Sequence, residues 1–459
     1  MTAAQPKNFK ISHDRAFYKS FALLTLPIIA QNIITHAVTL ADNIMVSGLG
    51  EVALDGVYVT NLVTMFVTQL IAGISPAMII LATQYWGKKD VKSMKNVISI
   101  GMRISLIGAA VIGAALLIFP QAILGLFTDD AAVVSAAVGY ARIIACTYVF
   151  YAVSNILIAA MRCAEVVRIG MVVSAAALAV NVSLNWVFIY GHFGVPAMGA
   201  PGAAISTLIS RIIEASIMVF YVFFRDKKLR IRISELLCRV ERVLLRDFVR
   251  YGFPVILGSA TWGINLLVQG AIIGHLDVNS ISAYSIAGTV FSILTVAAYG
   301  SATASSIVIA KTVGGGDIEK VKTYARTLQL IFLCVGIFTG ALIFFTRPLV
   351  LMIYGSMEAK TLEYANQFLI VLAAMSVGTS YQMATLTGIV RAGGATSFVL
   401  INDLIFVWCI VIPSAALAAF VFNAPSWVVV LCLKCDQILK CAVAVVEVNR
   451  FTWIKKLTR

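Results

Sequence analysis

The sequence predicts an all-α integral membrane protein with twelve transmembrane helices in two pseudo-symmetric six-helix lobes. Three observations support this fold class: the composition, the alternation of charge between successive polar breaks, and an internal repeat. Of the 459 residues, 60% are hydrophobic and 12% are charged, with a mean hydropathy of +0.95. Soluble domains are roughly 45–50% apolar and roughly 25% charged. A cytosolic enzyme, a secreted domain and a soluble nucleic-acid-binding fold are therefore excluded.

The apolar residues form twelve stretches separated by short polar breaks. A membrane-spanning helix needs about 20 such residues, and several stretches are longer, so we expect tilted helices or helices that extend beyond the bilayer. The expected spans are residues 21–48, 53–86, 97–119, 131–160, 167–190, 200–224, 247–274, 280–312, 324–345, 362–389, 396–420 and 425–448. The breaks contain turn-forming residues, such as the three glycines at 314–316.

Positive charge is concentrated in every second break. Of the 35 lysines and arginines, 29 lie in this set of breaks, and the alternate breaks hold only Arg347 and Lys360. Cytoplasmic loops of membrane proteins carry an excess of Lys and Arg. The pattern therefore supports the helix count and predicts that both termini are cytoplasmic.

The two halves of the chain are repeats of each other. Pro27 in the first span corresponds to Pro254 in the seventh, and the same offset relates Gly87 to Gly314. With six helices in each half, both halves begin on the same side of the membrane. Transporters with such parallel repeats are built around an axis along the membrane normal, and we expect substrate to bind between the two lobes.

The repeat suggests three parts of the chain. Residues 1–224 form the N-terminal lobe, residues 225–246 a basic cytoplasmic linker, and residues 247–459 the C-terminal lobe. No motif for ATP hydrolysis and no clustered His/Cys metal site is present, so we expect no enzymatic activity, no cofactor and no resident metal. Function must then depend on polar residues inside apolar helices, which cost free energy unless they have partners.

The first span carries the most informative polar face. Its spacing of 3, 4 and 3 residues places four polar side chains on one side of a helix. These are Asn32, Thr35, Thr39 and Asp42, with His36 at the flank. A carboxylate held partly out of water is suited to binding and releasing a proton, although an Asp near a helix end can also be merely hydrated. Pro27 removes a backbone hydrogen bond and permits a bend.

Three polar residues of the fifth and sixth spans complete a candidate site in the first half. Asn181 and Asn185 lie one turn apart, and Thr207 follows in the next span. Together with Asp42 they could bind a proton, or Na⁺ through Asp42, Asn181 and Thr207. Asparagine in a helix bundle can instead be structural.

The second half offers weaker candidates for a substrate pathway. Asn265 and Gln269 continue a polar stripe along the seventh span, and Asp403 lies in the eleventh. Asp403 could be a second titratable group, or it could pair with a basic residue near the membrane surface.

Several stretches, in this order, resemble the MATE (multidrug and toxic compound extrusion) family over nearly the whole chain. They are LPI at 26–28, ADNIMVSGLG at 41–50, GKKD at 87–90, NVSLNWVFIYG at 181–191, GAAIST at 202–207 and VRAGG at 390–394. The chain is most similar to the DNA-damage-inducible branch, which often has Asp where this chain has Asn185. A second branch carries carboxylates where this chain has Trp262 and, nearby, Ser380.

The resemblance implies a secondary antiporter in a bacterial inner membrane. It would export organic, mostly cationic and amphipathic compounds in exchange for H⁺ or Na⁺, and would use Asp42, Asn181, Asn185 and Thr207 for coupling. The expected partners are small organic molecules and membrane lipid, without nucleic acid, and we expect a monomer. The alternative is a flippase for lipid-linked sugars within the same superfamily.

Overall fold

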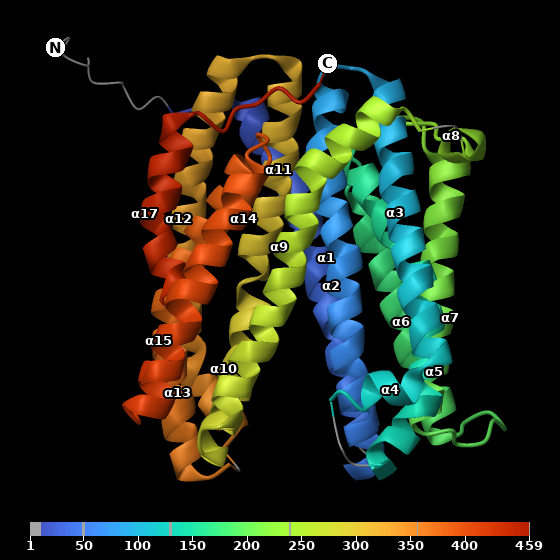
Figure 1. The fold of residues 1–459 in the computed structure, drawn as a ribbon, viewed down its shortest axis with the longest axis vertical. Coiled ribbons are helices and arrows are strands. Elements are labelled where there is room, and N and C mark those ends of the chain that lie inside the picture. The colour runs from blue at the N-terminus through green and yellow to red at the C-terminus, as the bar shows by residue number, and fades with distance from the viewer. Residues whose placement is uncertain (1–10, 48–50, 128–130, 238–239, 356, 459) are drawn as a thin grey trace. The chain divides into compact units, whose positions relative to one another are not determined.

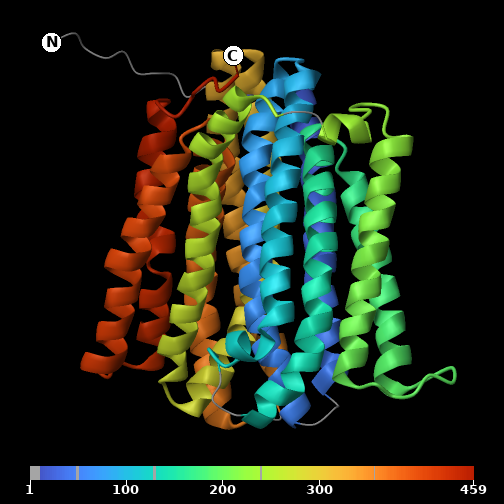
Figure 2. The ribbon, with the colours of Figure 1, turned by 45° about the vertical axis from the view of Figure 1, so that its right-hand side comes forward.

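The computed structural model describes residues 11–47, 51–127, 131–237, 240–355 and 357–458, and this described part contains helices and connecting turns but no strand. It divides into two compact units. The N-terminal unit comprises residues 30–86 and 90–264, and the C-terminal unit comprises residues up to Ile29, residues 87–89 and residues from Asn265 onward. Within each unit the long helices run alongside one another (Figures 1 and 2).

The N-terminal unit contains five long helices beside parts of two others. Its helices are α2 (Glu51–Gly87), α3 (Val91–Ile118), α4 (Pro120–Leu124), α5 (Ala131–Cys163), α6 (Arg168–Tyr190), α7 (Ala200–Phe220), the π-helical turn η1 (Tyr221–Arg225) and α8 (Ile233–Leu237). Its apolar core joins α2, α3, α5 and α7 around residues such as Tyr148 and Ala204, which are fully buried.

The C-terminal unit has more interruptions in its helices. Its elements are α10 (Val278–Leu294), α11 (Val296–Gly315), α12 (Ile318–Ile353), α13 (Ala359–Gly378), η2 (Thr379–Met383), η3 (Leu386–Val390), α14 (Thr396–Leu404), η4 (Ile405–Val411), α15 (Ile412–Ala416), η5 (Leu417–Val421), α16 (Ser426–Lys434) and α17 (Asp436–Arg450). The π-helical turns widen the tenth and eleventh spans, a feature that occurs often at functional sites.

Two long helices, α1 (Arg15–Ser47) and α9 (Arg242–Gly274), belong to both units. Helix α1 passes from one unit to the other after Ile29, two residues beyond Pro27, and α9 does so after Ile264, ten residues beyond Pro254. Each proline leaves one carbonyl of its helix without the usual intrahelical donor. The sequence analysis divided the chain at residues 224 and 247 from the internal repeat, whereas the two compact units are defined by contacts. The division based on the repeat stays a prediction.

The predicted fold class is confirmed. Eleven described helical segments are long and apolar enough to cross a membrane. The twelfth predicted span, residues 425–448, is built from α16 and α17, which have 9 and 15 residues and meet at Cys435. The eighth predicted span is likewise interrupted, at Thr295 between α10 and α11.

The basic linker folds against the N-terminal unit instead of forming an extended chain. The Lys95 ammonium of α3 pairs with the Glu235 carboxylate of α8 at 2.8 Å, and the Leu236 carbonyl accepts from Arg103 Nη2 at 2.8 Å. Burial alone would raise the pKa of Glu235, but hydrogen bonds from Lys95 and from the Arg232 backbone N–H, with the charge of Lys95, lower it. These contacts hold α8 beside the end of α3 (Figure 1).

The C-terminal segment after α17 packs back onto the turn before α14. Trp453 is fully buried, and its indole N–H donates to the Val448 carbonyl at 2.9 Å. A Cβ atom on Gly393 would lie 2.1 Å from the Trp453 ring, so only glycine fits there. The Lys455 backbone N–H also donates to the Gly393 carbonyl at 2.8 Å. The tail is thus part of the packed C-terminal unit.

We predict that Trp453→Ala destabilises the protein by about 3–5 kcal/mol, because it removes a large buried side chain and leaves a cavity. Thermal unfolding of the purified protein in detergent measures the effect. The control is Trp427→Ala, since the Trp427 side chain is 40% exposed. Equal losses in the two variants would contradict a structural role for the tail.

Candidate functional site

The candidate site in the N-terminal unit is centred on the carboxylate of Asp42. Asp42 lies in the last turns of α1 and is half-buried. The Asn185 side-chain amide of α6 donates to Asp42 Oδ1 at 2.5 Å. The Arg211 guanidinium of α7 is near enough to attract the same carboxylate. The structure therefore places the acidic residue of the first span against the two helices that the sequence predicted for the site.

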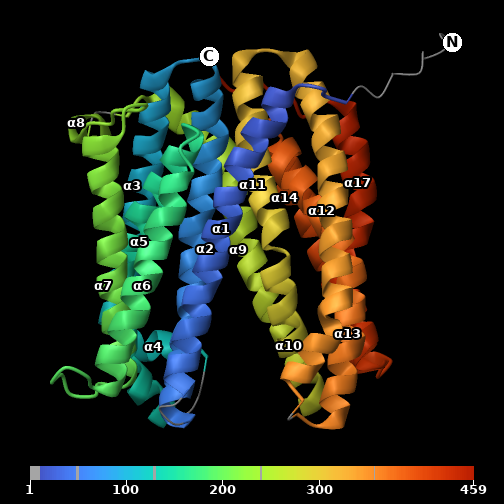
Figure 3. The same cartoon turned by 180° about the vertical axis from the view of Figure 1, so that it is seen from behind.

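Helix α6 supplies two amides that are almost completely buried. Asn185 and Asn181 are 0% and 1% exposed. The Asn185 amide nitrogen, besides its bond to Asp42, donates to Asn181 Oδ1 at 3.3 Å, and the Asn181 amide nitrogen donates to Thr207 Oγ1 at 3.4 Å. A continuous hydrogen-bonded chain thus runs from α1 across α6 to α7. Figure 3 labels these three helices.

Small residues explain why α6 and α7 come so close. A Cβ atom on Gly202 would lie 2.6 Å from the Phe188 carbonyl oxygen, so a larger residue at this position would push the helices apart. Gly191 ends α6 with a positive φ of 77°, and Gly199 precedes α7 with a φ of 60°. The short connection then returns Thr207 to the level of Asn181.

A partly buried ion pair lies beside this hydrogen-bonded chain on α7. Arg211 Nη1 and Glu214 Oε2 are 2.6 Å apart, with the Glu214 side chain only 7% exposed. The Arg211 guanidinium also lies 5.1 Å from the centre of the Tyr151 ring. Arg211 is thus paired with Glu214, whereas the printed hydrogen bond to Asp42 comes from the neutral amide of Asn185.

The predicted pathway residues of α1 differ in their exposure. Asn32 is half-buried, whereas Thr35 and His36 are exposed. The Thr35 hydroxyl donates to the Gln31 carbonyl of its own helix at 3.0 Å. The side chain of Thr39 lies outside the described part of the structure. The assignment of these residues to a substrate pathway stays a prediction.

Sequence reasoning missed Gln31. Its side chain is 6% exposed, its Oε1 accepts from Arg162 Nη2 at 2.7 Å, and its Nε2 donates to Ser174 Oγ at 3.2 Å. Arg162 Nε is buried without a hydrogen-bond partner in the described residues, so Gln31 provides an important acceptor for this cation. The sequence did contain a signal for this residue, because Gln31 stands next to Asn32 in an otherwise apolar run.

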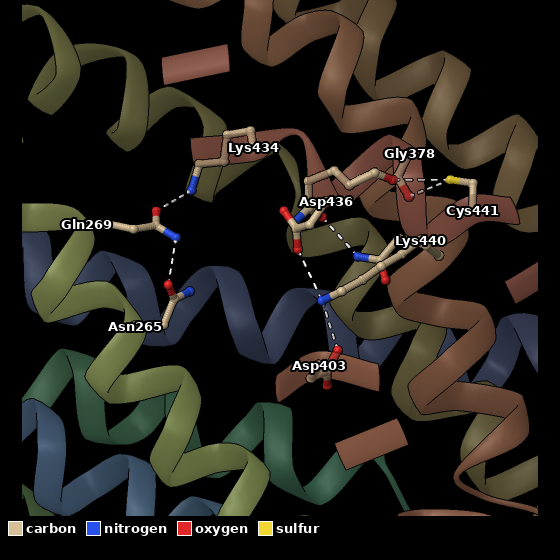
Figure 4. Close-up of polar contacts among 10 residues, drawn as sticks. Asn265, Gln269, Gly378, Asp403, Lys434, Asp436, Lys440 and Cys441 are labelled. Atoms are coloured by element: carbon tan, nitrogen blue, oxygen red, sulfur yellow. Dashed lines mark hydrogen bonds and ion pairs between the residues drawn. The ribbon is translucent and has the colours of Figure 1, made fainter. Parts of the chain in front are cut away.

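The candidates in the second half belong to two polar groups of the C-terminal unit, both drawn in Figure 4. Gln269 Nε2 donates to Asn265 Oδ1 at 3.1 Å, and Lys434 Nζ donates to Gln269 Oε1 at 3.1 Å. Asp403 pairs with Lys440 at 2.9 Å. The ion pair weighs toward the simpler interpretation of Asp403, and its part in a pathway stays a prediction.

Within the described ranges, no group of three or more His, Cys, Asp or Glu side chains is arranged to hold a metal ion. The charged side chains of the interior instead have amide, carboxylate or aromatic neighbours. A carboxylate with an amide partner, such as Asp42 with Asn185, has the chemistry to bind a proton or a monovalent cation without forming a covalent bond.

The MatE family model matches this chain twice, at residues 27–187 and at residues 254–417. The matches begin at Pro27 and Pro254, the two prolines that relate the halves of the sequence. The chain belongs to the MATE family. The double match also confirms the internal repeat.

Known proteins and solved structures match this chain over most of its length. The probable multidrug resistance protein NorM of Thermotoga maritima is 22% identical over 399 residues, which are 86% of this chain and 84% of that protein. A crystal structure of MATE in complex with MaL6 has a TM-score of 0.85 at 21% identity, covering 94% of this chain and 95% of the other. The structure of a MOP superfamily transporter from Pyrococcus furiosus has a TM-score of 0.85 at 21% identity, covering 96% of this chain and 97% of the other. This protein therefore has the fold of MATE transporters.

We predict that Gln31→Leu destabilises this MATE protein by about 1.5–3 kcal/mol, because Arg162 loses an acceptor for a buried charged donor. Thermal unfolding in detergent measures the change. Gln31→Glu keeps an acceptor oxygen and should remain close to the wild type. A leucine variant as stable as the wild type would show that Arg162 does not need Gln31.

Proposed function

We propose that this MATE transporter is a secondary antiporter that exports organic, mostly cationic and amphipathic compounds in exchange for protons. The observation that carries the proposal is Asp42, a half-buried carboxylate held by the Asn185–Asn181–Thr207 chain. In this apolar unit, a carboxylate can attract an organic cation when ionised and lose that attraction when protonated. Competition between the cation and the proton would then provide the exchange.

The orientation of the amides supports H⁺ rather than Na⁺ as the coupling ion. The Asn185 amide nitrogen, not its oxygen, faces Asp42 Oδ1, and the Asn181 amide nitrogen faces Thr207. Hard cations bind through oxygen ligands. A Na⁺ ion bound by Asp42, Asn181 and Thr207 would have to displace the Asn185 amide from Asn181 Oδ1, whereas a proton needs only a carboxylate oxygen.

Helix α1 provides a route from the proton to the motion of the protein. It carries Asp42 in the N-terminal unit and changes units two residues after Pro27. Protonation weakens the charge-assisted bond from Asn185 to Asp42 and so frees the outer part of α1. A bend at Pro27 would couple that change to alternating access, provided that the proton favours one conformation over the other.

The flippase alternative would need a predominantly cationic interior to receive phosphate groups. For the Pyrococcus furiosus transporter, a reversed polarity of the binding pocket suggests a different function. In this chain, Asp42 accepts a hydrogen bond from the Asn185 amide of the N-terminal unit, and Arg211 is paired with Glu214. This polarity supports cation exchange over phosphate recognition. Transfer of a fluorescent lipid-linked sugar between leaflets would test the alternative directly.

We further propose that the protein works as a monomer in a bacterial inner membrane with both termini in the cytoplasm. The concentration of lysines and arginines in every second break supports this orientation. Basic side chains beside the spans, including those around α8, would contact anionic lipid headgroups.

We predict that Asp42→Asn reduces efflux of ethidium from energised liposomes at least about tenfold, because the neutral side chain can neither attract the cation nor exchange a proton. The full-length protein is reconstituted, and pH and Na⁺ gradients are imposed separately. The control is Asp277→Asn, which removes a surface carboxylate paired with Lys360 and can still cap α10. Undiminished efflux by Asp42→Asn would overturn the proposed role.

We also predict that Asn185→Asp makes transport respond to Na⁺. Two adjacent carboxylates repel each other unless a cation lies between them, so the variant should gain a stimulation by Na⁺ that the wild type lacks. Ethidium efflux is compared in NaCl and choline chloride at the same pH. Sodium stimulation of the wild type, or none in the variant, would contradict the assignment of proton coupling.

A further inference from the structure

Two lysines of the last span differ in the groups that surround their ammonium groups. Lys440 of α17 is 5% exposed and lies between Asp403 at 2.9 Å and Asp436 at 3.1 Å (Figure 4). Its ammonium also lies 5.8 Å from the centre of the Phe406 ring. Two carboxylates neutralise this buried cation, and the cluster needs no further partner.

Lys434, six residues earlier in α16, has no such carboxylate. Its ammonium donates to Gln269 Oε1 at 3.1 Å, and no carboxylate forms an ion pair with it in the described part of the chain. Asp436 is already engaged, since its Oδ2 pairs with Lys440 and its Oδ1 accepts from Gln437 Nε2 at 2.8 Å. An ammonium has three N–H donors, and Gln269 occupies one.

Lys434 is half-buried and lies inside the last predicted span, although it is the final residue of α16. It lies eight residues after Ser426, the first residue of α16, which corresponds to about 12 Å along a helix. Its acceptor Gln269 is 5% exposed, so the ammonium points toward the interior of the C-terminal unit. Because this half-buried ammonium has a neutral acceptor and no paired carboxylate among the described residues, it is a candidate group for binding an anion.

The acceptor is itself held in place. Gln269 Nε2 donates to Asn265 Oδ1, one turn earlier on α9, and Asn265 is 6% exposed. This bond orients the Gln269 oxygen toward Lys434. The N-terminal unit uses the same device with the opposite charge, because the amide pair of α6 presents a nitrogen to Asp42.

We propose that Lys434, oriented by Gln269 and Asn265, is the binding site for an anionic group of transported compounds, such as a carboxylate or sulfonate. The proposal rests on the transport function proposed above and refines its substrate class. Compounds that carry an anionic group beside an amphipathic cation would be bound through Lys434, whereas purely cationic compounds would not use it.

A matched pair of fluorescent probes tests this assignment. Rhodamine B carries a free carboxylate, and its ethyl ester is the same cation without that carboxylate. We expect Lys434→Gln to weaken binding of rhodamine B to the purified protein about tenfold or more, as expected for the loss of a charge-assisted bond, and to leave binding of the ester within about twofold. Fluorescence anisotropy gives both affinities without requiring transport.

Three comparisons make the result decisive. Lys434→Arg keeps the charge and should retain most of the preference for rhodamine B, and Lys360→Gln, on the surface, should change neither affinity. Equal weakening of both probes by Lys434→Gln, or no weakening, would overturn the proposal. Displacement of rhodamine B by phosphatidylglycerol but not by phosphatidylcholine would also overturn it, because the site would then belong to a lipid headgroup.

Efflux of the same probes from liposomes separates this inference from the proposed function. If the wild type transports both probes and Lys434→Gln affects them equally, the antiporter stands and the anionic site falls. If the wild type transports neither under a pH or Na⁺ gradient, the antiporter falls, and the anisotropy comparison still decides whether Lys434 binds anions. Size-exclusion profiles and thermal unfolding confirm that each variant is folded.

Discussion

The need to satisfy each charged or polar group inside an apolar helical unit governs this structure. A charge in the membrane interior persists only where it is paired or hydrogen bonded. Asp42 is held by Asn185, Arg211 by Glu214, and Lys440 by two carboxylates. The positions of these partners dictate which helices must come close, and close approach is possible because glycine and alanine lie where the helices touch.

The units satisfy this constraint in different ways. In the N-terminal unit, Asn181 and Asn185 lie on one unbroken helix and present their amides at successive turns. In the C-terminal unit, Asp403 lies just before the π-helical turn η4, and Lys434 and Asp436 flank the break of the last span at Cys435. The break ends α16 at Lys434 and starts α17 at Asp436, so neighbouring residues of opposite charge face different partners.

Helices α1 and α9 have two features in common. Each contains a proline, and each is shared between the two compact units. A missing intrahelical bond lowers the resistance of a helix to bending. Asp42 lies on α1 and the Gln269–Asn265 pair lies on α9, so each of these polar groups is carried by a proline-containing helix that is shared between the units.

The sequence by itself determined the fold class, because composition, charge alternation and the repeat are averaged over many residues. Helical spacing also singled out Asp42 on one span and Asn181 with Asn185 on another, and Thr207 was grouped with them from the following span; their function stays a prediction. The sequence did not determine the other contacts between polar residues of different helices. Gln31 with Arg162, and Lys434 with Gln269, are joined across 131 and 165 residues. Such pairs depend on how the helices pack, and helical periodicity describes only one helix at a time. Only the tertiary structure could therefore decide that Lys440 is neutralised and that Lys434 is not.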